Sequence, residues 1–339
     1  MTTLLTPAYR LSIGHNVVDT TAEPKASVTT DLMVSVDIDA WPDSASLTLG
    51  QVGGIDPALR DNTTLELGYA DNGGFTQVFT GLVEAIRTSL LTRQVTFTSA
   101  GRALARLRVD QTYEGQTAGA IVRDLATQAN VGLGAVDDGI TFPAYVIDKH
   151  RTAVAQIREL AALSGVDAYI DSGGKLVFQA FTTGQVVHDV DYAKQILTLE
   201  IERLSETDVT VHAWGESPTG RAGADSWGWL VKDFSSSEGT AGSGPKPIFV
   251  ERPALRTSTA AATAASARLR TIQRRAVSGV VTMPGRPEIK LGDAIALRDV
   301  PTATINDTYQ VRHVTHRVTK EGGFTTTVRF AAIPSEALP

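Results

Sequence analysis

The first hundred residues alternate between apolar and polar positions in several short runs. The apolar positions of the clearest runs are Tyr9, Leu11 and Ile13; Leu32, Val34, Val36 and Ile38; and Leu65, Leu67 and Tyr69. A period of two predicts β-strands that bury one face and expose the other. The turn sequence at 71–74 and the run over 75–87 that follows it add a hairpin. Several short strands separated by turns predict a small β-barrel, which we place at residues 1–105.

Residues 106–190 have a different pattern, because apolar residues recur there every three or four positions, as in amphipathic helices. Thr117 is a candidate N-cap for a first helix. A second helix is expected over about 152–163, with Gly165 just past its end, where left-handed backbone favours glycine. The run 167–178 predicts a hairpin around a Gly-Gly turn. Two helices and a hairpin together predict a small α+β insert.

The β pattern returns after residue 190, so we expect a second β-barrel over 191–339. This part contains a serine- and glycine-rich segment at 233–247, which is expected to be a flexible loop. An alanine-rich run at 258–275 that ends in arginines predicts a long helix, because cations favour the C-terminal end of the helix dipole. The apolar positions change phase around Arg312, which predicts a β-bulge. The predicted fold is a β-rich α+β class with two small β-barrel domains bridged by an α+β insert.

The composition narrows the function classes. The chain has 339 residues, of which 42% are hydrophobic and 20% charged, as is typical of a packed globular protein rather than a disordered one. The formal net charge is −6, so we expect no nucleic-acid binding, which rests on a basic surface. The chain has no cysteine, which excludes disulfides, thiolate metal sites and a cysteine nucleophile.

The sequence shows no targeting or membrane segment. The first basic residue is Arg10, and no apolar run near the N-terminus has the form of a secretory signal peptide. No stretch approaches the roughly 18 apolar residues of a membrane span. We therefore expect a protein that is made in the cytoplasm without a signal peptide and without stable membrane insertion.

Two pairs of carboxylates are candidates for catalysis. Asp37 with Asp39, and Glu200 with Glu202, each lie on one face of a predicted strand. Paired carboxylates can in principle serve acid–base hydrolysis. The simpler interpretation is a solvated strand face or a sheet edge protected by charge. We therefore predict no catalytic residue.

Metal and phosphate sites are not indicated either. His313 and His316 are three positions apart on a predicted strand, so they face opposite sides and do not suit a shared metal ion. The glycine-rich segments lack the lysine and the helix start of a phosphate-binding loop. We predict no cofactor.

Three segments, taken in order, carry a family resemblance. In residues 79–126 a strand pair is followed by a basic connector, an extended bridge and a capped helix. Residues 154–178 contain a helix, a glycine and a strand pair. Near the end, a Gly-Asp turn at 287–293 precedes a Tyr-x-Val run and a histidine at 309–316, and then a closing strand at 324–330. This order resembles the baseplate hub proteins of contractile phage tails and injection systems, which include the late control protein D family and the hub part of type VI secretion spikes.

The resemblance implies a structural protein and not an enzyme. In this family each chain carries two similar barrels, and three chains form a ring. The implied function is a homotrimeric hub that adapts a six-fold tail tube to a three-fold spike. The implied partners are tail-tube proteins, baseplate wedge proteins and a spike. Because the chain ends at Pro339 without a long β-helical extension, we expect the spike to be a separate protein. The implied location is a phage virion tail or an extracellular contractile particle.

Three tryptophans are candidate interface residues. They are Trp214, Trp227 and Trp229, and the last two share one strand face in a segment flanked by glycine and serine. Exposed aromatic side chains often anchor interfaces. The alternative is that these side chains fill a barrel core.

Three arginines of the basic connector are further candidates. Arg102 and Arg106 share a face if the connector is helical, and Arg108 follows them. They can pair across a subunit boundary or within one subunit.

Two other functions stay open. One is a tail-associated enzyme that degrades glycan or peptidoglycan through one of the carboxylate pairs. The other is a sugar- or receptor-binding β protein that uses Trp227 and Trp229.

Overall fold

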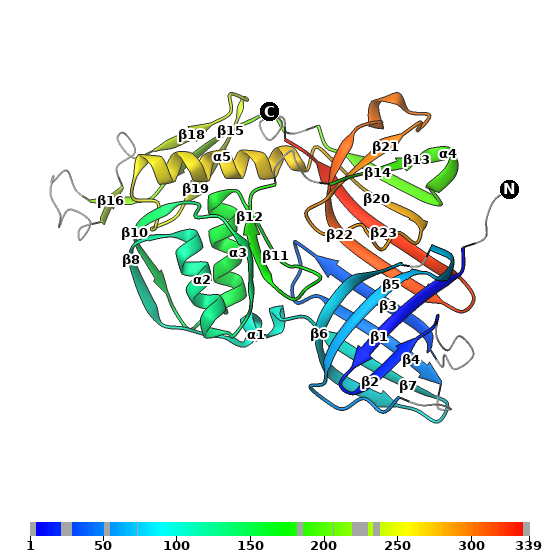
Figure 1. Cartoon of the computed structure of the whole chain (residues 1–339). Coiled ribbons are helices and arrows are strands. Elements are labelled where there is room, and N and C mark those ends of the chain that lie inside the picture. The colour runs from blue at the N-terminus through cyan, green and yellow to red at the C-terminus, as the bar shows by residue number, and fades with distance from the viewer. Residues whose placement is uncertain are drawn as a thin grey trace.

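The computed structural model describes residues 5–21, 29–50, 55–72, 74–181, 186–205, 207–218, 230–232 and 238–334. Strands dominate these residues, and the longer helices gather on one side of the molecule (Figure 1). The β-rich α+β class predicted from the sequence is therefore confirmed. None of the helices in this part of the chain is long and apolar enough to cross a membrane.

One continuous sheet forms the right-hand part of the molecule in Figure 1. From edge to edge, its main path contains β14 (Thr198–Arg203), β20 (Val277–Pro284), β23 (Gly323–Ala332), β22 (Thr308–Thr319), β3 (Thr29–Asp37), β4 (Ser44–Gly50), β7 (Thr92–Thr98), β6 (Gly74–Thr88), β5 (Asn62–Tyr69), β1 (Pro7–Ile13) and β2 (Asn16–Asp19). β21 (Ala294–Arg298) pairs with β22, and β13 (Val187–Asp191) pairs with β21. The edge strands β14 and β2 do not pair with each other within the described residues, so this sheet does not close into a barrel.

The structure shows one sheet that runs through both β regions and no closed barrel among the described residues, so the two-barrel arrangement expected from the sequence stays a prediction. The connection is the antiparallel pairing of β3 with β22, in which Asp37 lies opposite His313 and Asp31 lies opposite Thr319. This pairing satisfies backbone groups that would otherwise lie unpaired along both strands. Periodicity indicates which face of a strand is buried, but it carries no information on which strand lies beside it.

Two apolar cores lie against this sheet. The N-terminal core contains the alternating apolar residues of β1, β3, β4, β5, β6 and β7, with Phe97 fully buried, and it is completed by Val318 and Phe324 from the C-terminal strands. The C-terminal core contains Tyr309 and Phe330, whose ring centroids lie 4.8 Å apart. Residues from the end of the chain thus complete the core built at its beginning.

The α+β region lies beside the sheet. In chain order its elements are α1 (Gly101–Arg106), β8 (Gln111–Thr117), α2 (Ala118–Gln128), β9 (Leu133–Val136), β10 (Thr141–Ile147), α3 (Ala153–Ser164), β11 (Asp167–Ile170) and β12 (Leu176–Gln179). Thr117 caps α2 by accepting the Ala120 N–H at 3.1 Å, and Thr152 caps α3 by accepting the Ala155 N–H at 3.3 Å. Gly165 ends α3 with φ 71°. The caps, the two helices and the β11–β12 hairpin predicted from the sequence are confirmed.

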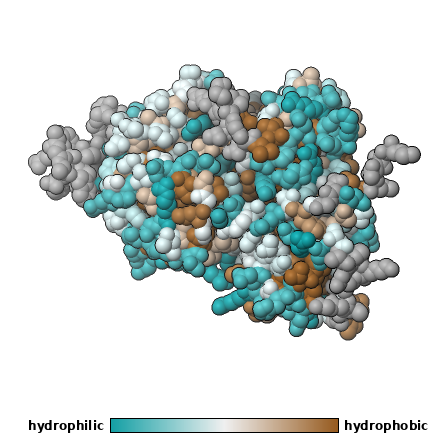
Figure 2. All heavy atoms as spheres, viewed as in Figure 1, coloured by the Kyte–Doolittle hydropathy of each residue, from teal (hydrophilic) through white to brown (hydrophobic). Residues whose placement is uncertain are grey.

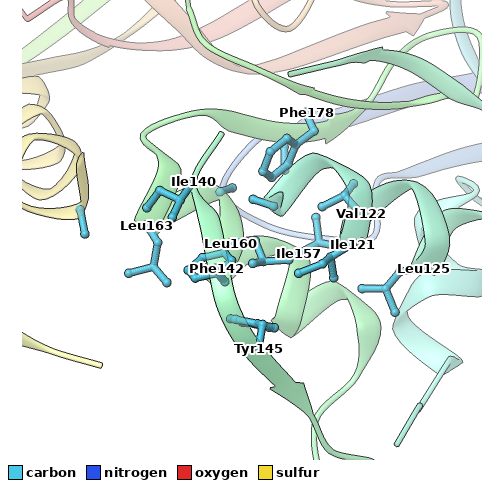
Figure 3. Close-up of a cluster of buried hydrophobic side chains, with 14 of the residues drawn as sticks. Ile121, Val122, Leu125, Ile140, Phe142, Tyr145, Ile157, Leu160, Leu163 and Phe178 are labelled. Carbon is cyan, nitrogen blue, oxygen red and sulfur yellow. The ribbon is translucent and has the colours of Figure 1, made fainter. Parts of the chain in front are cut away.

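The inner faces of α2 and α3 form a third core. Ile121 and Val122 of α2 lie close to Ile157 and Leu160 of α3, with Phe142 of β10 beside them (Figure 3). All five side chains are fully buried. Burial of side chains of this size contributes about 1.5–3 kcal/mol each, which fixes the two helices against the strands.

The long helix predicted over 258–275 is α5 (Ser258–Arg274), and it packs onto this third core. It lies against β15 (Val209–Trp214) and β18 (Gly239–Ala241). Its buried small residues are Ala260, Ala261, Ala264, Ala265 and Ala267. These short side chains allow the strands to approach the helix closely, so the alanine face is used for packing inside the chain.

The flexible loop expected at 233–247 is corrected in its second half. Residues 233–237 lie outside the described part of the chain, whereas β18 and β19 (Lys246–Glu251) pair with the two edges of β15. The glycines serve close packing here, because a Cβ at Gly239 would lie 2.1 Å from the backbone of Ala261, and one at Gly244 would lie 2.1 Å from the backbone of Asp208.

The remaining elements are short. They are α4 (Tyr192–Gln195), the antiparallel pair β16 (Glu216–Pro218) and β17 (Leu230–Lys232), and the 3-10 turns η1 (Ala70–Asn72) and η3 (Ala303–Ile305). The visible face of the molecule is largely hydrophilic, with hydrophobic atoms in separate patches (Figure 2). The boundaries expected after residues 105 and 190 stay a prediction.

Gly239→Ala tests the close approach of β18 to α5. The added Cβ would overlap the helix backbone at Ala261, so one element must shift. We expect the free energy of unfolding, measured by urea denaturation, to fall by about 1–3 kcal/mol. Gly74→Ala is the control, because no atom lies within 4 Å of a Cβ at that position. Similar losses in both variants would contradict the close packing of α5.

Candidate functional site

The connector arginines are held by acceptors of their own chain. Arg102 Nη2 lies 2.5 Å from Glu84 Oε1, and Arg106 Nη2 lies 3.2 Å from the same oxygen. Arg108 donates to two backbone carbonyl oxygens at residues 149–150, at 3.0 and 2.6 Å. These bonds fix the connector against β6 and the loop before α3. Contact of these arginines with another subunit stays a prediction.

Trp214 lies at the end of β15 and is only 8% exposed, so most of its ring is covered by the protein. Its ring meets the Phe249 ring edge-on, with centroids 5.8 Å apart. Phe249 itself is 64% exposed. Trp227 and Trp229 lie outside the described residues. Among the described residues of this region, Phe249 is an exposed aromatic side chain, which sequence reasoning missed because the edge position of its strand is visible only in the structure.

The first carboxylate pair is neutralised by arginines. Arg329 Nη2 lies 2.8 Å from Asp37 Oδ1 and 3.1 Å from Asp39 Oδ2. Arg312 Nη2 lies 2.5 Å from Asp39 Oδ1. Carboxylates held in this way accept several charge-assisted hydrogen bonds, which suits a structural role.

The second carboxylate pair lies on a sheet edge. Glu200 and Glu202 are both exposed on β14, which pairs on one side with β20. Charged side chains on an edge strand hinder unwanted pairing with another sheet. This placement fits the simpler interpretation made from the sequence.

The two neighbouring histidines point to different sites. His313 Nε2 lies 2.9 Å from Ser35 Oγ, whereas His316 Nδ1 lies 3.0 Å from Thr326 Oγ1. Complete burial lowers the pKa of His316 to about 4, so its ring is neutral at physiological pH. Within the described residues, no three histidine or carboxylate side chains gather closely enough to hold a metal ion.

A buried ionic cluster lies where the parts of the chain meet. Asp167 of β11 accepts from Arg312 Nη1 at 2.6 Å and from Gln310 Nε2 at 2.6 Å, both on β22. Arg274, at the end of α5, lies 3.3 Å from the same carboxylate. Arg312 reaches on to Asp39, which follows β3. One guanidinium group therefore links the two β regions to the α+β region.

A β-bulge lies at Arg312 of this cluster. The pairing of β22 with β23 shifts between Val311 and His313, as the phase change in the sequence predicted. The residues from Tyr309 to Arg312 are all buried, because both faces of β22 are covered here. Tyr309 and Val311 lie in the C-terminal core, whereas Gln310 and Arg312 face the other side and meet Asp167.

The opposite charges in the cluster stabilise each other. Burial by itself would raise the pKa of Asp167, but the positive charges of Arg312 and Arg274 hold it below its ordinary value. The carboxylate therefore stays ionised inside the protein. The cluster is a structural clamp, which we call the Arg312 clamp and define as Arg312, Asp167, Arg274, Gln310 and Asp39. Sequence reasoning located the bulge but missed the partners, since they come from distant parts of the chain.

The similarity of this chain to known proteins lies in its fold. Neither a protein-family model nor a curated protein matches the sequence. The 43 kDa tail protein of prophage MuSo2 from Shewanella oneidensis is similar in structure, with a TM-score of 0.70 at 14% identity over 96% of this chain and 98% of that one. The tail protein from Neisseria meningitidis MC58 has a TM-score of 0.73 at 14% identity, over 98% and 100%. The chain has the fold of a tail protein.

A third similar structure comes from a secretion system. It is an Escherichia coli component of the type VI secretion system, described as structurally similar to the T4 bacteriophage tail proteins gp27 and gp5. The TM-score is 0.61 at 11% identity, over 97% of this chain and 78% of that one. The resemblance to hub proteins stated from the sequence is thereby confirmed at the level of fold.

Arg312→Met tests the clamp. The variant leaves Asp167 buried without its main partner, so we expect the free energy of unfolding to fall by about 3–5 kcal/mol. Arg317→Ala, on the same strand, removes an exposed pair with Asp31 and should cost no more than about 1 kcal/mol. Urea denaturation compares the two. In a double-mutant cycle, Asp167→Leu should cost less in the Arg312→Met background than alone. Strictly additive losses would show that the pair is not coupled.

A second buried carboxyl, Asp43, lies between β3 and β4 and is 4% exposed. Its Oδ1 accepts the Asp37 N–H at 2.8 Å. Burial raises the pKa of Asp43 to about 7, against that hydrogen bond, which lowers it. The folded protein therefore keeps a proton that the unfolded chain releases near pH 4.

This proton makes stability depend on pH. Because the folded state binds the extra proton, the contribution of Asp43 to the unfolding free energy falls as the pH rises from about 4 to about 7, by up to about 1.4 kcal/mol per pH unit. Asp43→Asn keeps an acceptor for the Asp37 N–H and removes the titration. We expect its stability relative to the wild type, measured by urea denaturation at several pH values, to rise over this range and then level off. A difference independent of pH would contradict the assignment.

Proposed function

We propose that this chain is a structural hub of a contractile tail or injection particle. In this proposal it forms a homotrimer and adapts a six-fold tail tube to a three-fold spike. The observation that carries the proposal is the likeness of fold, over nearly the whole chain, to two tail proteins and to a type VI secretion component. Its partners would be tail-tube proteins, baseplate wedge proteins and a separate spike protein.

The sheet suits this role because it has two halves, each with a core of its own, although Val318 and Phe324 of the C-terminal half also enter the N-terminal core. The N-terminal half contains β1 to β7, and the C-terminal half contains β20 to β23. We propose that these halves act as the two barrel-like units of each chain, with the α+β region between them in the sequence. Three chains would then offer six similar surfaces to a six-fold tube, and a closed ring follows from head-to-tail contacts.

The joint between the halves suits a protein that carries load. The backbone hydrogen bonds of β3 with β22 cross the joint, and the Arg312 clamp lies beside it. The backbone hydrogen bonds of this pairing and the ion pair of Arg312 with Asp39 must break before the halves separate. A hub that passes force from a contracting sheath to a spike needs such a joint.

The alternative functions have less support. Arginines occupy the Asp37 and Asp39 pair, and Glu200 and Glu202 lie on an exposed strand. The sugar-binding alternative depends on Trp227 and Trp229, which lie outside the described residues, so it stays a prediction. We therefore favour a non-enzymatic role, with assembly into a virion tail or an extracellular particle.

The native mass of the purified protein tests the proposal. Light scattering should give three times the chain mass of 36.0 kDa, alone or once a candidate spike protein is added. The addition of spike should yield one complex with three copies of this chain. A monomer in both samples would contradict the hub and would favour the glycan-cleaving or sugar-binding alternatives.

A further inference from the structure

A groove of about 590 Å³ lies between α3, β19 and α5. Small and apolar side chains line its inner part: Ala155, Ala162, Leu163 and Ala264. Its volume lies in the range of clefts that hold a ligand or a segment of a partner. The groove lies outside the continuous sheet, and none of its lining residues belongs to the Arg312 clamp.

One wall of the groove is the free edge of a strand. β19 is the last strand of the β18–β15–β19 sheet, and it pairs only with β15 within the described residues. Phe249, Val250 and Glu251 are consecutive in β19, and all three line the groove. Because alternate residues of a strand point to opposite faces, a groove lined by consecutive residues lies along the strand edge. Backbone N–H and C=O groups of β19 are thus directed toward it.

Phe249 is a supported aromatic side chain at the mouth of the groove. It is 64% exposed, yet its ring stacks on His212 with centroids 5.5 Å apart and meets the Trp214 ring from the other direction. His212 is itself held by Glu238. A large apolar ring that is fixed in position and left open to solvent is typical of a contact anchor.

The groove is more positive than the protein around it. Its charged lining residues are Arg151, Arg158, Arg252, Arg268, Glu159 and Glu251. Glu159 pairs with both Arg151 and Arg252. Arg158 and Arg268 form no ion pair with the carboxylates of the described residues, although Arg158 donates to the backbone carbonyl oxygen of Asp39. On a chain whose net charge is −6, this local excess of positive charge favours an acidic partner.

We propose that this groove docks an extended acidic segment of a protein partner. The segment adds a strand to the free edge of β19, covers Phe249 with an apolar side chain, and places carboxylates near Arg158 and Arg268. A polypeptide fits better than a nucleic acid, since only a polypeptide satisfies the strand edge and leaves Glu159 and Glu251 without a facing row of phosphates. This inference goes beyond the hub proposal and does not depend on trimerisation.

Binding to the full-length protein tests the inference. The probe is a short fluorescent peptide of alternating glutamate and valine, with a matched lysine–valine peptide and a single-stranded DNA as comparisons. Fluorescence anisotropy should show binding of the acidic peptide alone, weakening as salt rises. Hydrogen exchange at the amides of β19 should slow when this peptide is bound, because the added strand protects the edge.

Variants then locate the site. Arg268→Glu should weaken binding of the acidic peptide by about tenfold or more, since it reverses a charge in the groove. Phe249→Ser should weaken binding without any change of charge. Arg87→Glu is the matched control, because Arg87 is an exposed arginine of β6 outside the groove, and it should leave binding unchanged.

Four outcomes would overturn the inference. The first is that the acidic peptide does not bind. The second is that Arg268→Glu and Arg87→Glu lower the affinity for this peptide equally. The DNA binds as tightly and responds to the same variants, which would indicate a general polyanion surface. Arg268→Glu lowers the native mass, which would make the groove a contact between copies of this chain. If the wild-type protein forms no trimer, that result counts against the hub proposal alone. It leaves the peptide-binding inference unaffected.

Discussion

The buried pair of Arg312 and Asp167 is the constraint on which the arrangement of the whole chain depends. Two charges removed from water are costly unless each finds a close partner and its remaining hydrogen bonds are met. Here those partners come from β11, β22, α5 and the end of β3. If one part of the chain moved, a buried charge would lose its partner. The clamp therefore specifies one relative placement of the three cores, which apolar packing alone defines less sharply.

The continuous sheet and the clamp together fix the parts of the chain relative to one another. The strand pairing at β3 and β22 joins the beginning of the chain to its end, and Val318 and Phe324 complete the N-terminal core. Assembly of this kind suits a protein whose work is to hold its neighbours in place. The groove lies between α3, β19 and α5, outside the continuous sheet, so a partner there would leave both halves of that sheet free for other contacts.

Helix ends and the β-bulge were predictable from the sequence, whereas contacts between distant parts of the chain were not. Thr117 and Gly165 act at the ends of helices through bonds within a few residues, so the sequence predicted both. The bulge at Arg312 was visible as a change of phase. The interface candidates stay predictions, but their surroundings were not predictable: Trp214 is mostly covered, Arg102 and Arg106 bind Glu84 of their own chain, and the exposed Phe249 was missed. Exposure depends on what folds over a residue, which periodicity does not describe.

The sequence by itself determined the strands, the capped helices, the order of β and α+β regions, and the family resemblance, because each depends on spacing along the chain. Tertiary structure alone decided that one sheet runs through both β regions, that the segment after residue 238 joins a sheet beside α5, and that distant charges meet at Arg312. These outcomes depend on which backbone edges and charges approach in space. Long-range pairing is selected by the total free energy of the packed chain, and no local pattern records it.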